Sequence, residues 1–216
     1  MTRIALIHGL ADSMAPINQA LARDWCEAQR MNLLDDSLAA DLARAGRLDA
    51  TMTRRFLALG DYAVANGADA MLFTCSAFGP CIDAVARRYP DLPVLKPNEA
   101  MIDAALAALA GTAGGIGLLA SFGPTLASMP AEFPPGTPLQ TALADGALAA
   151  LQAGDLAAHD RLAADAAAGL ADDGCRLIAL AQFSLARARD AVAERTGLPV
   201  LTAVDSAIAR LRARLG

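Results

Sequence analysis

The sequence contains an internal duplication, which constrains the fold more than any other feature. The segment DAVARRYPDLPVLKPNEAMI (83–102) matches DAVAERTGLPVLTAVDSAI (190–208) in order and spacing, apart from one deleted residue before the second LPVL. The same offset of 107 residues aligns MLFTCSA (71–77) with IALAQFS (178–184). Two looser matches precede these: RIALIHG (3–9) with GIGLLAS (115–121), and ARAGRLDA (43–50) with LQAGDLAA (151–158). Self-similarity of this kind predicts two copies of one structural unit.

Each half alternates between strand and helix patterns. The expected strands are short apolar runs bounded by turn residues, at 3–8, 29–34, 69–74, 92–95, 115–120, 138–143, 176–181 and 198–201. Runs that are apolar throughout are typical of parallel strands buried on both faces. Helical patterns such as CIDAVARRY (81–89) and SAIARLRARLG (206–216) separate or follow them.

This alternation predicts an α/β fold of two pseudo-symmetric lobes, each with a four-stranded parallel sheet flanked by helices. We expect the first lobe to comprise residues 1–98 plus 205–216, and the second to comprise residues 99–204.

Composition excludes several classes of protein. A hydrophobic content of 55% excludes disorder, and a net charge of −5 leaves no basic excess for nucleic-acid phosphates. The uncharged stretch 104–122 approaches the length of a membrane span, but alanine dominates it and GTAGG interrupts it. We interpret it as a helix, a glycine turn and a buried strand, and expect no membrane partner.

The N-terminus lacks a secretory signal, so the four cysteines predict reduced thiols in the cytoplasm.

Polar residues follow the expected strands, and in parallel α/β sheets ligands bind outside the carboxyl ends of the strands. In the first half these residues are His8, Ser13, Asp35, Asp36, Ser37, Thr74, Cys75, Ser76, Lys96, Asn98 and Glu99. In the second half they are Ser121, Thr125, Gln182, Ser184, Thr202 and Asp205. A twofold repeat with facing lobes predicts an active site in the cleft between them, with Cys75 and Gln182 on opposite walls.

Cys75 directly precedes a helical pattern that carries Pro80 in its first turn. A cysteine at a helix N-terminus lies near free N–H groups and the positive end of the dipole, which lowers the thiol pKa. The same N–H groups can receive a carboxylate or an enolate, and nearby hydroxyls can add hydrogen bonds. The alternative is a buried filler, because free cysteine is among the most buried residue types. Position alone leaves both interpretations open.

Five segments together resemble the aspartate/glutamate racemase superfamily: RIALIHG, FTCSAFG, GIGLLASFGPT, LIALAQFSLA and the repeated LPVL. This superfamily includes hydantoin racemases, maleate isomerases and arylmalonate decarboxylases, and the resemblance covers nearly the whole chain. It implies two Rossmann-like lobes around a cleft, with one cysteine from each lobe and with neither cofactor nor metal. The thiols of such enzymes exchange the proton next to a substrate carboxylate. The resemblance also suggests a homodimer.

The second cysteine of that pattern is missing. Inverting a carbon centre requires one group to remove a proton and another to deliver one to the opposite face. Cys75 matches the first position, but Gln182, followed by Phe183, occupies the second, where the family has Cys followed by Thr or Ser. An amide can hydrogen-bond a carboxylate or enolate but cannot act as the base. Cys175, expected before its strand at the far end of the sheet, is no replacement.

Arylmalonate decarboxylases resemble a one-cysteine version of this site, in which loss of CO₂ leaves an enolate and a single thiol protonates one face. Gln182 is therefore compatible with decarboxylation or with covalent isomerisation through Cys75, and less compatible with amino-acid racemisation.

The remaining candidates have simpler interpretations. The spacing of Cys75 and Cys81 is not that of a CxxC redox pair, and we expect Cys81 to be packed inside its helix. His8 and His159 are the only histidines, and no zinc-binding spacing is present. For His8, a role in substrate positioning or as an acid and a role as a hydrogen-bonded loop histidine remain equally open.

Two interpretations of Lys96 are a positive charge for a substrate carboxylate and a strand-end lysine that extends its charged end into solvent, and the second is the commoner case. Asp35, Asp36 and Ser37 are expected to cap the helix LAADLARAG. The glycines do not form GxGxxG, so no nucleotide site is expected.

The sequence thus predicts a cytoplasmic, cofactor-independent enzyme acting on a small carboxylate or dicarboxylate. Cys75 is the expected proton donor, acceptor or nucleophile, and Gln182 is its polar partner. The expected substrate-binding residues are His8, Thr74, Ser76, Ser121, Thr125 and Ser184. Racemase or isomerase chemistry is the leading expectation, and the alternatives are a decarboxylase, a non-catalytic carboxylate-binding protein and a thiol redox sensor.

Overall fold

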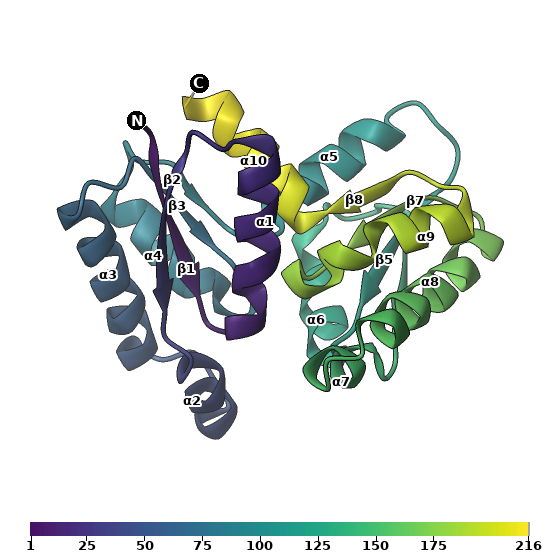
Figure 1. The fold of residues 1–216 in the computed structure, drawn as a ribbon, viewed down its shortest axis with the longest axis horizontal. Helices are drawn as coiled ribbons and strands as arrows, with labels where there is room; N and C mark the ends of the chain where they lie inside the picture. The colour runs from purple at the N-terminus through teal and green to yellow at the C-terminus, as the bar shows by residue number, and fades with distance from the viewer. Residues whose placement is uncertain (216) are drawn as a thin grey trace. The chain divides into compact units, whose positions relative to one another are not determined.

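The computed structural model describes residues 1–215, which form two compact units (Figure 1). The first unit contains residues 1–97 and the described residues from Ala207 onwards, and the second contains residues 98–206. Each unit has one sheet of four strands, and every strand pairing is parallel. The predicted α/β architecture with two four-stranded parallel sheets is therefore confirmed. Gly216, the last residue of the predicted C-terminal helix, lies outside the described residues.

The sheet of the first unit has the strand order β2-β1-β3-β4. Its elements are β1 (Arg3–His8), α1 (Met14–Asp24), β2 (Gln29–Leu34), α2 (Leu38–Ala45), α3 (Ala50–Ala65), β3 (Ala70–Phe73), α4 (Gly79–Arg88) and β4 (Val94–Leu95). Short 3-10 helices, η1 (Ala11–Ser13) and η2 (Ser76–Phe78), follow β1 and β3. The C-terminal helix α10 (Ala203–Leu215) begins in the second unit and continues into the first.

The sheet of the second unit has the corresponding order β6-β5-β7-β8. Its elements are α5 (Glu99–Leu109), β5 (Gly115–Ala120), α6 (Gly123–Ser128), η3 (Met129–Glu132), β6 (Leu139–Leu143), α7 (Ala147–Gln152), α8 (Leu156–Asp172), β7 (Cys175–Leu180), η4 (Phe183–Ala188), α9 (Arg189–Thr196) and β8 (Val200–Thr202). The duplicated sequence therefore produces a duplicated topology, in which the first strand of each unit pairs with the second and the third.

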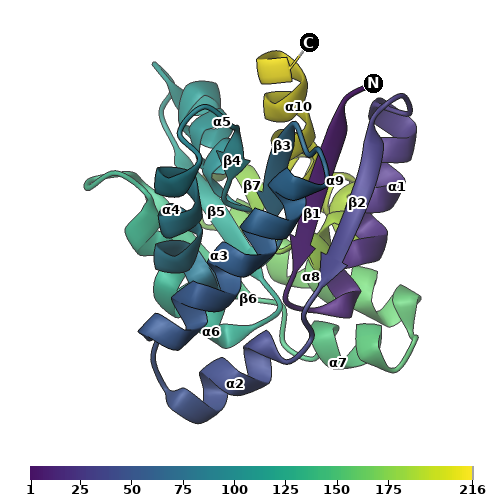
Figure 2. The same cartoon turned by 90° about the vertical axis from the view of Figure 1, so that its left-hand side faces the viewer.

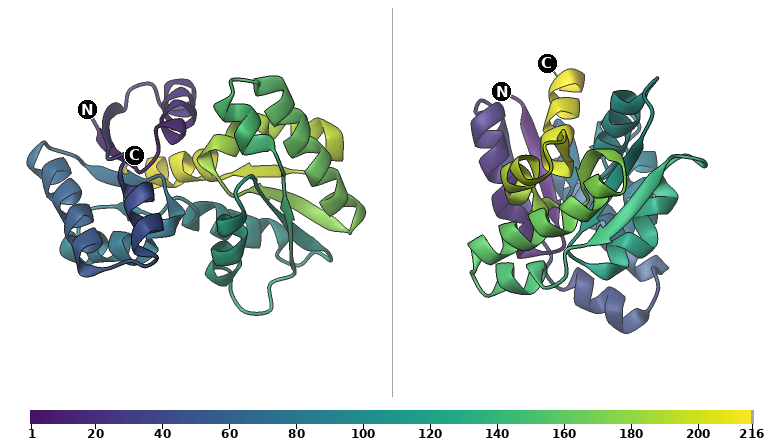
Figure 3. Two further views of the ribbon diagram at one scale, coloured as in Figure 1. Left: turned by 90° about the horizontal axis from the view of Figure 1, so that it is seen from below. Right: turned by 90° about the vertical axis from the view of Figure 1, so that its right-hand side faces the viewer.

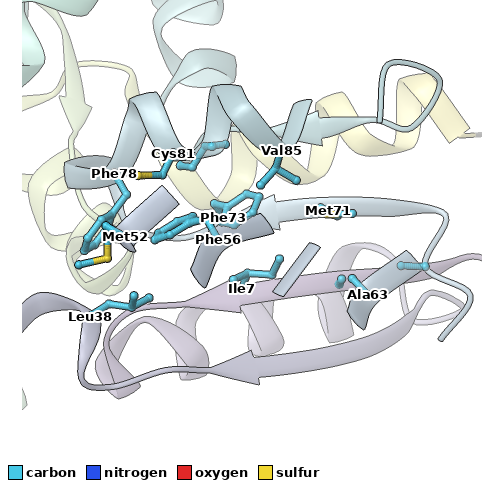
Figure 4. Packing of buried hydrophobic residues seen from close by; sticks show 13 residues of the cluster. Ile7, Leu38, Met52, Phe56, Ala63, Met71, Phe73, Phe78, Cys81 and Val85 are labelled. Atoms are coloured by element: carbon cyan, nitrogen blue, oxygen red, sulfur yellow. The ribbon is translucent and has the colours of Figure 1, made fainter. Parts of the chain in front are cut away.

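The core of the first unit lies between its sheet and the helices α3 and α4 (Figure 2). Phe56 of α3 stacks on Phe73 of β3 with ring centroids 5.5 Å apart, and the ring centroids of Phe56 and Phe78 are 5.0 Å apart. Cys81 is fully buried in the same cluster (Figure 4). The expectation that Cys81 is a packed residue is thus confirmed.

The core of the second unit is built from smaller side chains. Alanines of α8, with Leu170, pack against β5 and β7, and α9 adds Val192. The ribbon of this unit runs from teal to yellow in Figure 3. Gly117 of β5 permits this close approach, because a Cβ atom there would lie 2.9 Å from Cδ1 of Ile178 and 3.0 Å from Leu170. The uncharged stretch 104–122 contains the end of α5, a turn and β5, as expected. Among residues 1–215, no helix is both long and apolar enough to cross a membrane.

Two local expectations were wrong. Cys175 is the first residue of β7 and pairs with Gly115, so it lies inside the strand instead of before it. The side chain of Ser37 makes no capping bond to α2. Its hydroxyl instead donates to Asp35 at 2.7 Å and accepts a hydrogen bond from Arg55 of α3 at 2.6 Å. Arg55 also pairs with Asp35 and Asp41. A charged guanidinium is a stronger donor to the Ser37 oxygen than a backbone N–H of the helix.

Candidate active site

Cys75 lies just past the carboxyl end of β3, in extended backbone conformation (φ −128°, ψ 116°), as the N-cap residue of η2. The helix η2 leads directly into α4, which has Pro80 in its first turn. The backbone N–H of Ala77 acts on the Cys75 sulfur in the direction that lowers the thiol pKa. Cys75 is partly buried and packs against the core cluster of the first unit. It therefore occupies the edge of the sheet where ligands of parallel α/β proteins bind.

Burial raises the pKa of the Cys75 thiol above its ordinary value of 9.0, and the N–H of Ala77 offsets this only in part. The sequence-based expectation of a lowered pKa was wrong. The three-residue η2 stands between Cys75 and the first residue of α4, Gly79, so the sulfur does not lie at the N-terminus of the longer helix. Desolvation then dominates, because the thiolate loses hydration in this partly apolar setting. A raised pKa favours the protonated thiol over the thiolate, as a proton donor requires.

A network of uncharged polar side chains lies behind this loop and centres on His8, the last residue of β1. His8 is fully buried. Its Nδ1 is 3.0 Å from Oγ1 of Thr74 and 3.1 Å from Oγ of Ser13, and its Nε2 is 3.0 Å from Oδ1 of Asn32. Desolvation lowers the pKa of His8, with the hydrogen bond to Asn32 acting in the opposite direction. His8 is thus hydrogen-bonded through both ring nitrogens, from the end of a strand instead of from a loop.

The candidate binding residues of the first unit differ in exposure. Thr74 is buried, and its hydroxyl contacts Ser13 at 2.8 Å as well as His8. Ser76 is partly buried, and within residues 1–215 its hydroxyl has no hydrogen-bond partner. Ser76 is thus the side chain in this loop whose hydroxyl is free to meet a ligand.

In the second unit, Gln182 is the N-cap residue of η4. Its Oε1 accepts hydrogen bonds from the backbone N–H of Ser121 at 2.6 Å and from the Ser121 hydroxyl at 3.1 Å. Because a backbone N–H can only donate, these contacts identify the oxygen of the amide, and its NH₂ group has no hydrogen-bond partner within residues 1–215. Thr125 is buried and Ser184 is partly buried, and neither hydroxyl makes a side-chain hydrogen bond within the described residues.

The backbone hydrogen bonds give the equivalences between the two copies. Thr74 N–H donates to Ile7 O, and Ala181 N–H donates to Leu119 O, at 3.0 and 2.9 Å. The following residues, Cys75 and Gln182, are therefore structurally equivalent, as the sequence offset predicted. The structure brings Ser121 and Gln182 together in one unit, and Thr74 and His8 together in the other.

Asn18 and Asn32 were missed by the sequence-based reasoning. They hydrogen-bond each other at 2.9 and 3.2 Å and connect α1 to β2 behind His8. The only signal was a polar residue in the middle of the expected strand QRMNLL, which on its own is also typical of an exposed strand position.

The other candidates are accounted for by local contacts. Lys96 pairs with Asp83 at 2.7 Å. His159 is buried and its Nδ1 contacts Asp160, which also binds Arg187. All four cysteines are free. Within the described part of the chain, no group of three or more His, Cys, Asp or Glu side chains is arranged to hold a metal ion.

Two parallel α/β units of the same topology, one carrying a thiol at the carboxyl edge of its sheet, define a class of duplicated α/β proteins. A family model described as Asp/Glu/Hydantoin racemase matches residues 12–211. The chain therefore belongs to the Asp/Glu/hydantoin racemase family and is an enzyme of the racemase or isomerase type.

Solved structures share the fold at low sequence identity. Glutamate racemase isoform RacE1 from Bacillus anthracis superimposes with a TM-score of 0.72 at 12% identity, covering 99% of this chain and 81% of that one. Allantoin racemase from Klebsiella pneumoniae gives a TM-score of 0.74 at 16% identity, covering 99% and 87%. Glutamate racemase from Francisella tularensis, solved with D-glutamate, gives 0.68 at 12% identity, covering 99% and 81%. A comparison with curated proteins found no match.

Proposed function

We propose that this protein is a cofactor-independent enzyme that transfers a proton at the carbon next to a carboxylate of a small substrate, with Cys75 as the transferring group. The observation that carries the proposal is the placement of Cys75. It is the one cysteine that is partly accessible and also follows a strand at the carboxyl edge of a sheet, whereas Cys81 and Cys175 are buried and Cys26 precedes β2. Family membership supports the same chemistry.

The proton moves between the Cys75 sulfur and the α-carbon. A protonated thiol gives its proton to the carbanionic carbon of an enolate, and the resulting thiolate is protonated again from solvent or removes a proton in the reverse direction. The NH₂ group of Gln182 and the hydroxyls of Ser76, Thr125 and Ser184 supply hydrogen bonds to carboxylate or enolate oxygens. Because an amide has no usable pKa near neutrality, Gln182 cannot act as an acid or a base, and Cys75 is the group that transfers the proton.

Decarboxylation is a second candidate, favoured by the raised pKa of Cys75 together with the amide at position 182. In this reaction the bond between the α-carbon and one carboxylate of a substituted malonate breaks. The electron pair stays on the α-carbon as an enolate, CO₂ leaves, and the Cys75 S–H proton is transferred to that carbon. A protonated thiol on one face is sufficient for this chemistry, whereas racemisation requires a second acid–base group.

Exchange of deuterium from buffer tests the proposal. The wild-type enzyme is incubated in D₂O with a panel of small mono- and dicarboxylates, including 2-substituted malonates, and isotope incorporation at the α-carbon and CO₂ release are measured. We expect Cys75→Ala to reduce the rate by about 100-fold or more, while Cys26→Ala, at an exposed position before β2, retains it. Absence of exchange and CO₂ release across the panel would refute the enzymatic proposal, and binding without exchange would identify a carboxylate-binding protein.

The four free cysteines support a reducing compartment such as the cytoplasm. The homodimer suggested by the family resemblance stays a prediction, which sedimentation equilibrium tests directly.

A further inference from the structure

We propose that His8 and Thr74 are positioning residues for Cys75 that do not touch the substrate. This inference deepens the proposed function and rests on it. It follows from the donor and acceptor roles in the hydrogen-bond network around His8. The backbone carbonyl of Met14 determines these roles.

The starting point is Asn18, whose Nδ2 donates to the backbone carbonyl of Met14 at 2.8 Å. Because a carbonyl oxygen only accepts, the orientation of the Asn18 amide is determined. The same Nδ2 donates to Oδ1 of Asn32 at 2.9 Å, and Asn32 Nδ2 donates back to Asn18 Oδ1 at 3.2 Å. The oxygen of the Asn32 amide therefore faces His8.

The Asn32 oxygen in turn determines the tautomer of His8. It lies 3.0 Å from His8 Nε2 and can only accept, so Nε2 carries a hydrogen. Burial disfavours the charged imidazolium, which leaves Nδ1 with a lone pair. Nδ1 is then an acceptor for the hydroxyl of Thr74 at 3.0 Å, because the Ser13 hydroxyl donates to the Leu10 carbonyl.

Counting hydroxyl hydrogens shows that none is left for a substrate. Ser13 and Thr74 together have two, which can serve only two of three short contacts: Ser13 to the Leu10 carbonyl at 2.7 Å, Ser13 to Thr74 at 2.8 Å, and Thr74 to His8 Nδ1 at 3.0 Å. Thr74 therefore cannot donate to a substrate oxygen without breaking a buried contact. Its role is to hold the backbone that immediately precedes Cys75.

The second unit provides an internal comparison. The backbone bonds Asp35 N–H to His8 O and Ala144 N–H to Ala120 O are equivalent, so Ala120 occupies the position of His8. Ala181 likewise occupies the position of Thr74. The fold therefore forms without this network, and the network is present in the copy that carries the thiol. This asymmetry associates it with the chemistry of Cys75 instead of with folding.

The tautomer is measurable without a substrate. In protein labelled with ¹⁵N-histidine, long-range proton–nitrogen NMR spectra at neutral pH distinguish the two ring nitrogens. The chain has two histidines, and the His8 signals are those that disappear in His8→Gln. We expect hydrogen on Nε2 and a lone pair on Nδ1. The opposite tautomer would overturn the assignment.

Kinetics then separate positioning from substrate contact. We expect Thr74→Val, which is nearly isosteric but lacks the hydroxyl, to lower kcat by about tenfold with little change in KM. Thr74→Ser, which keeps the hydroxyl, is expected to restore kcat. A raised KM with unchanged kcat in Thr74→Val would show that Thr74 binds substrate and would overturn the proposal. If the wild-type protein exchanges no substrate, the proposed function fails, while the NMR result still decides the tautomer.

Discussion

Cys75 and Gln182 occupy the same position in the two copies of the duplicated unit. Each is the second residue after a central strand and the N-cap of a 3-10 helix, with φ and ψ of −128° and 116° for Cys75 and −132° and 145° for Gln182. One copy thus presents an S–H group, and the other presents an amide held by Ser121. The difference in chemistry between two positions of the same geometry motivates the first two predictions.

The reactivity of Cys75 toward iodoacetamide should reflect its raised pKa. Only the thiolate reacts, so a pKa above 9.0 lowers the thiolate fraction at neutral pH, and the rate should rise with pH to a midpoint above 9.0. The rate is measured by mass spectrometry of the Cys75 peptide in a Cys26→Ala background, which removes the exposed thiol. A plateau already reached at pH 7 would contradict the raised pKa.

Replacing Gln182 by cysteine should create a second proton-transfer group. Because Gln182 has the backbone geometry of Cys75, a Gln182→Cys side chain starts from an equivalent position, and we expect racemisation of a substrate to appear or increase. Chiral chromatography of recovered substrate measures it. Gln182→Ser is the matched control, because serine is similar in size to cysteine but its hydroxyl has no usable pKa. Equal racemisation by both variants would mean that the thiol at position 182 has no role.

The aromatic cluster of the first unit should account for much of its stability. We expect Phe56→Ala to lower the free energy of unfolding by about 3–5 kcal/mol, because it leaves a cavity between Phe73 and Phe78. Tyr62→Ala on the same helix, at an exposed position, should change it by less than about 0.5 kcal/mol. Urea unfolding monitored by circular dichroism compares the two, and similar costs would contradict the predicted role of the cluster.

Two glycines of the second unit should respond in opposite directions to alanine. Gly117→Ala places a methyl group within 3.0 Å of Ile178 and Leu170 and should destabilise by about 1–3 kcal/mol. Gly169 lies in the last turn of α8, and a Cβ atom there would meet no other atom within 4 Å. Gly169→Ala should therefore raise the free energy of unfolding by about 0.5–1 kcal/mol. Thermal unfolding distinguishes these outcomes, and destabilisation by Gly169→Ala would contradict the second.

The strand pattern and the repeat were predictable because both depend on local order along the chain. Short apolar runs between turn residues identified all eight strands, with boundary errors that include Cys175, β4, which contains only Val94 and Leu95, and β8, which begins at Val200. The equivalence of Cys75 and Gln182 followed from the offset alone. The pKa direction of Cys75 was not predictable, because it depends on how closely distant side chains approach the sulfur.

The amino-acid sequence by itself therefore determined the duplicated α/β topology and the identity of the thiol and the amide at matching strand ends. Only the tertiary structure decided that burial raises the pKa of this thiol and that His8 is enclosed between Asn32 and Thr74, residues that are 42 positions apart in the chain. Hydrophobic periodicity is a property of a local segment of the sequence, whereas desolvation and hydrogen-bond direction arise when separate strands and helices pack together.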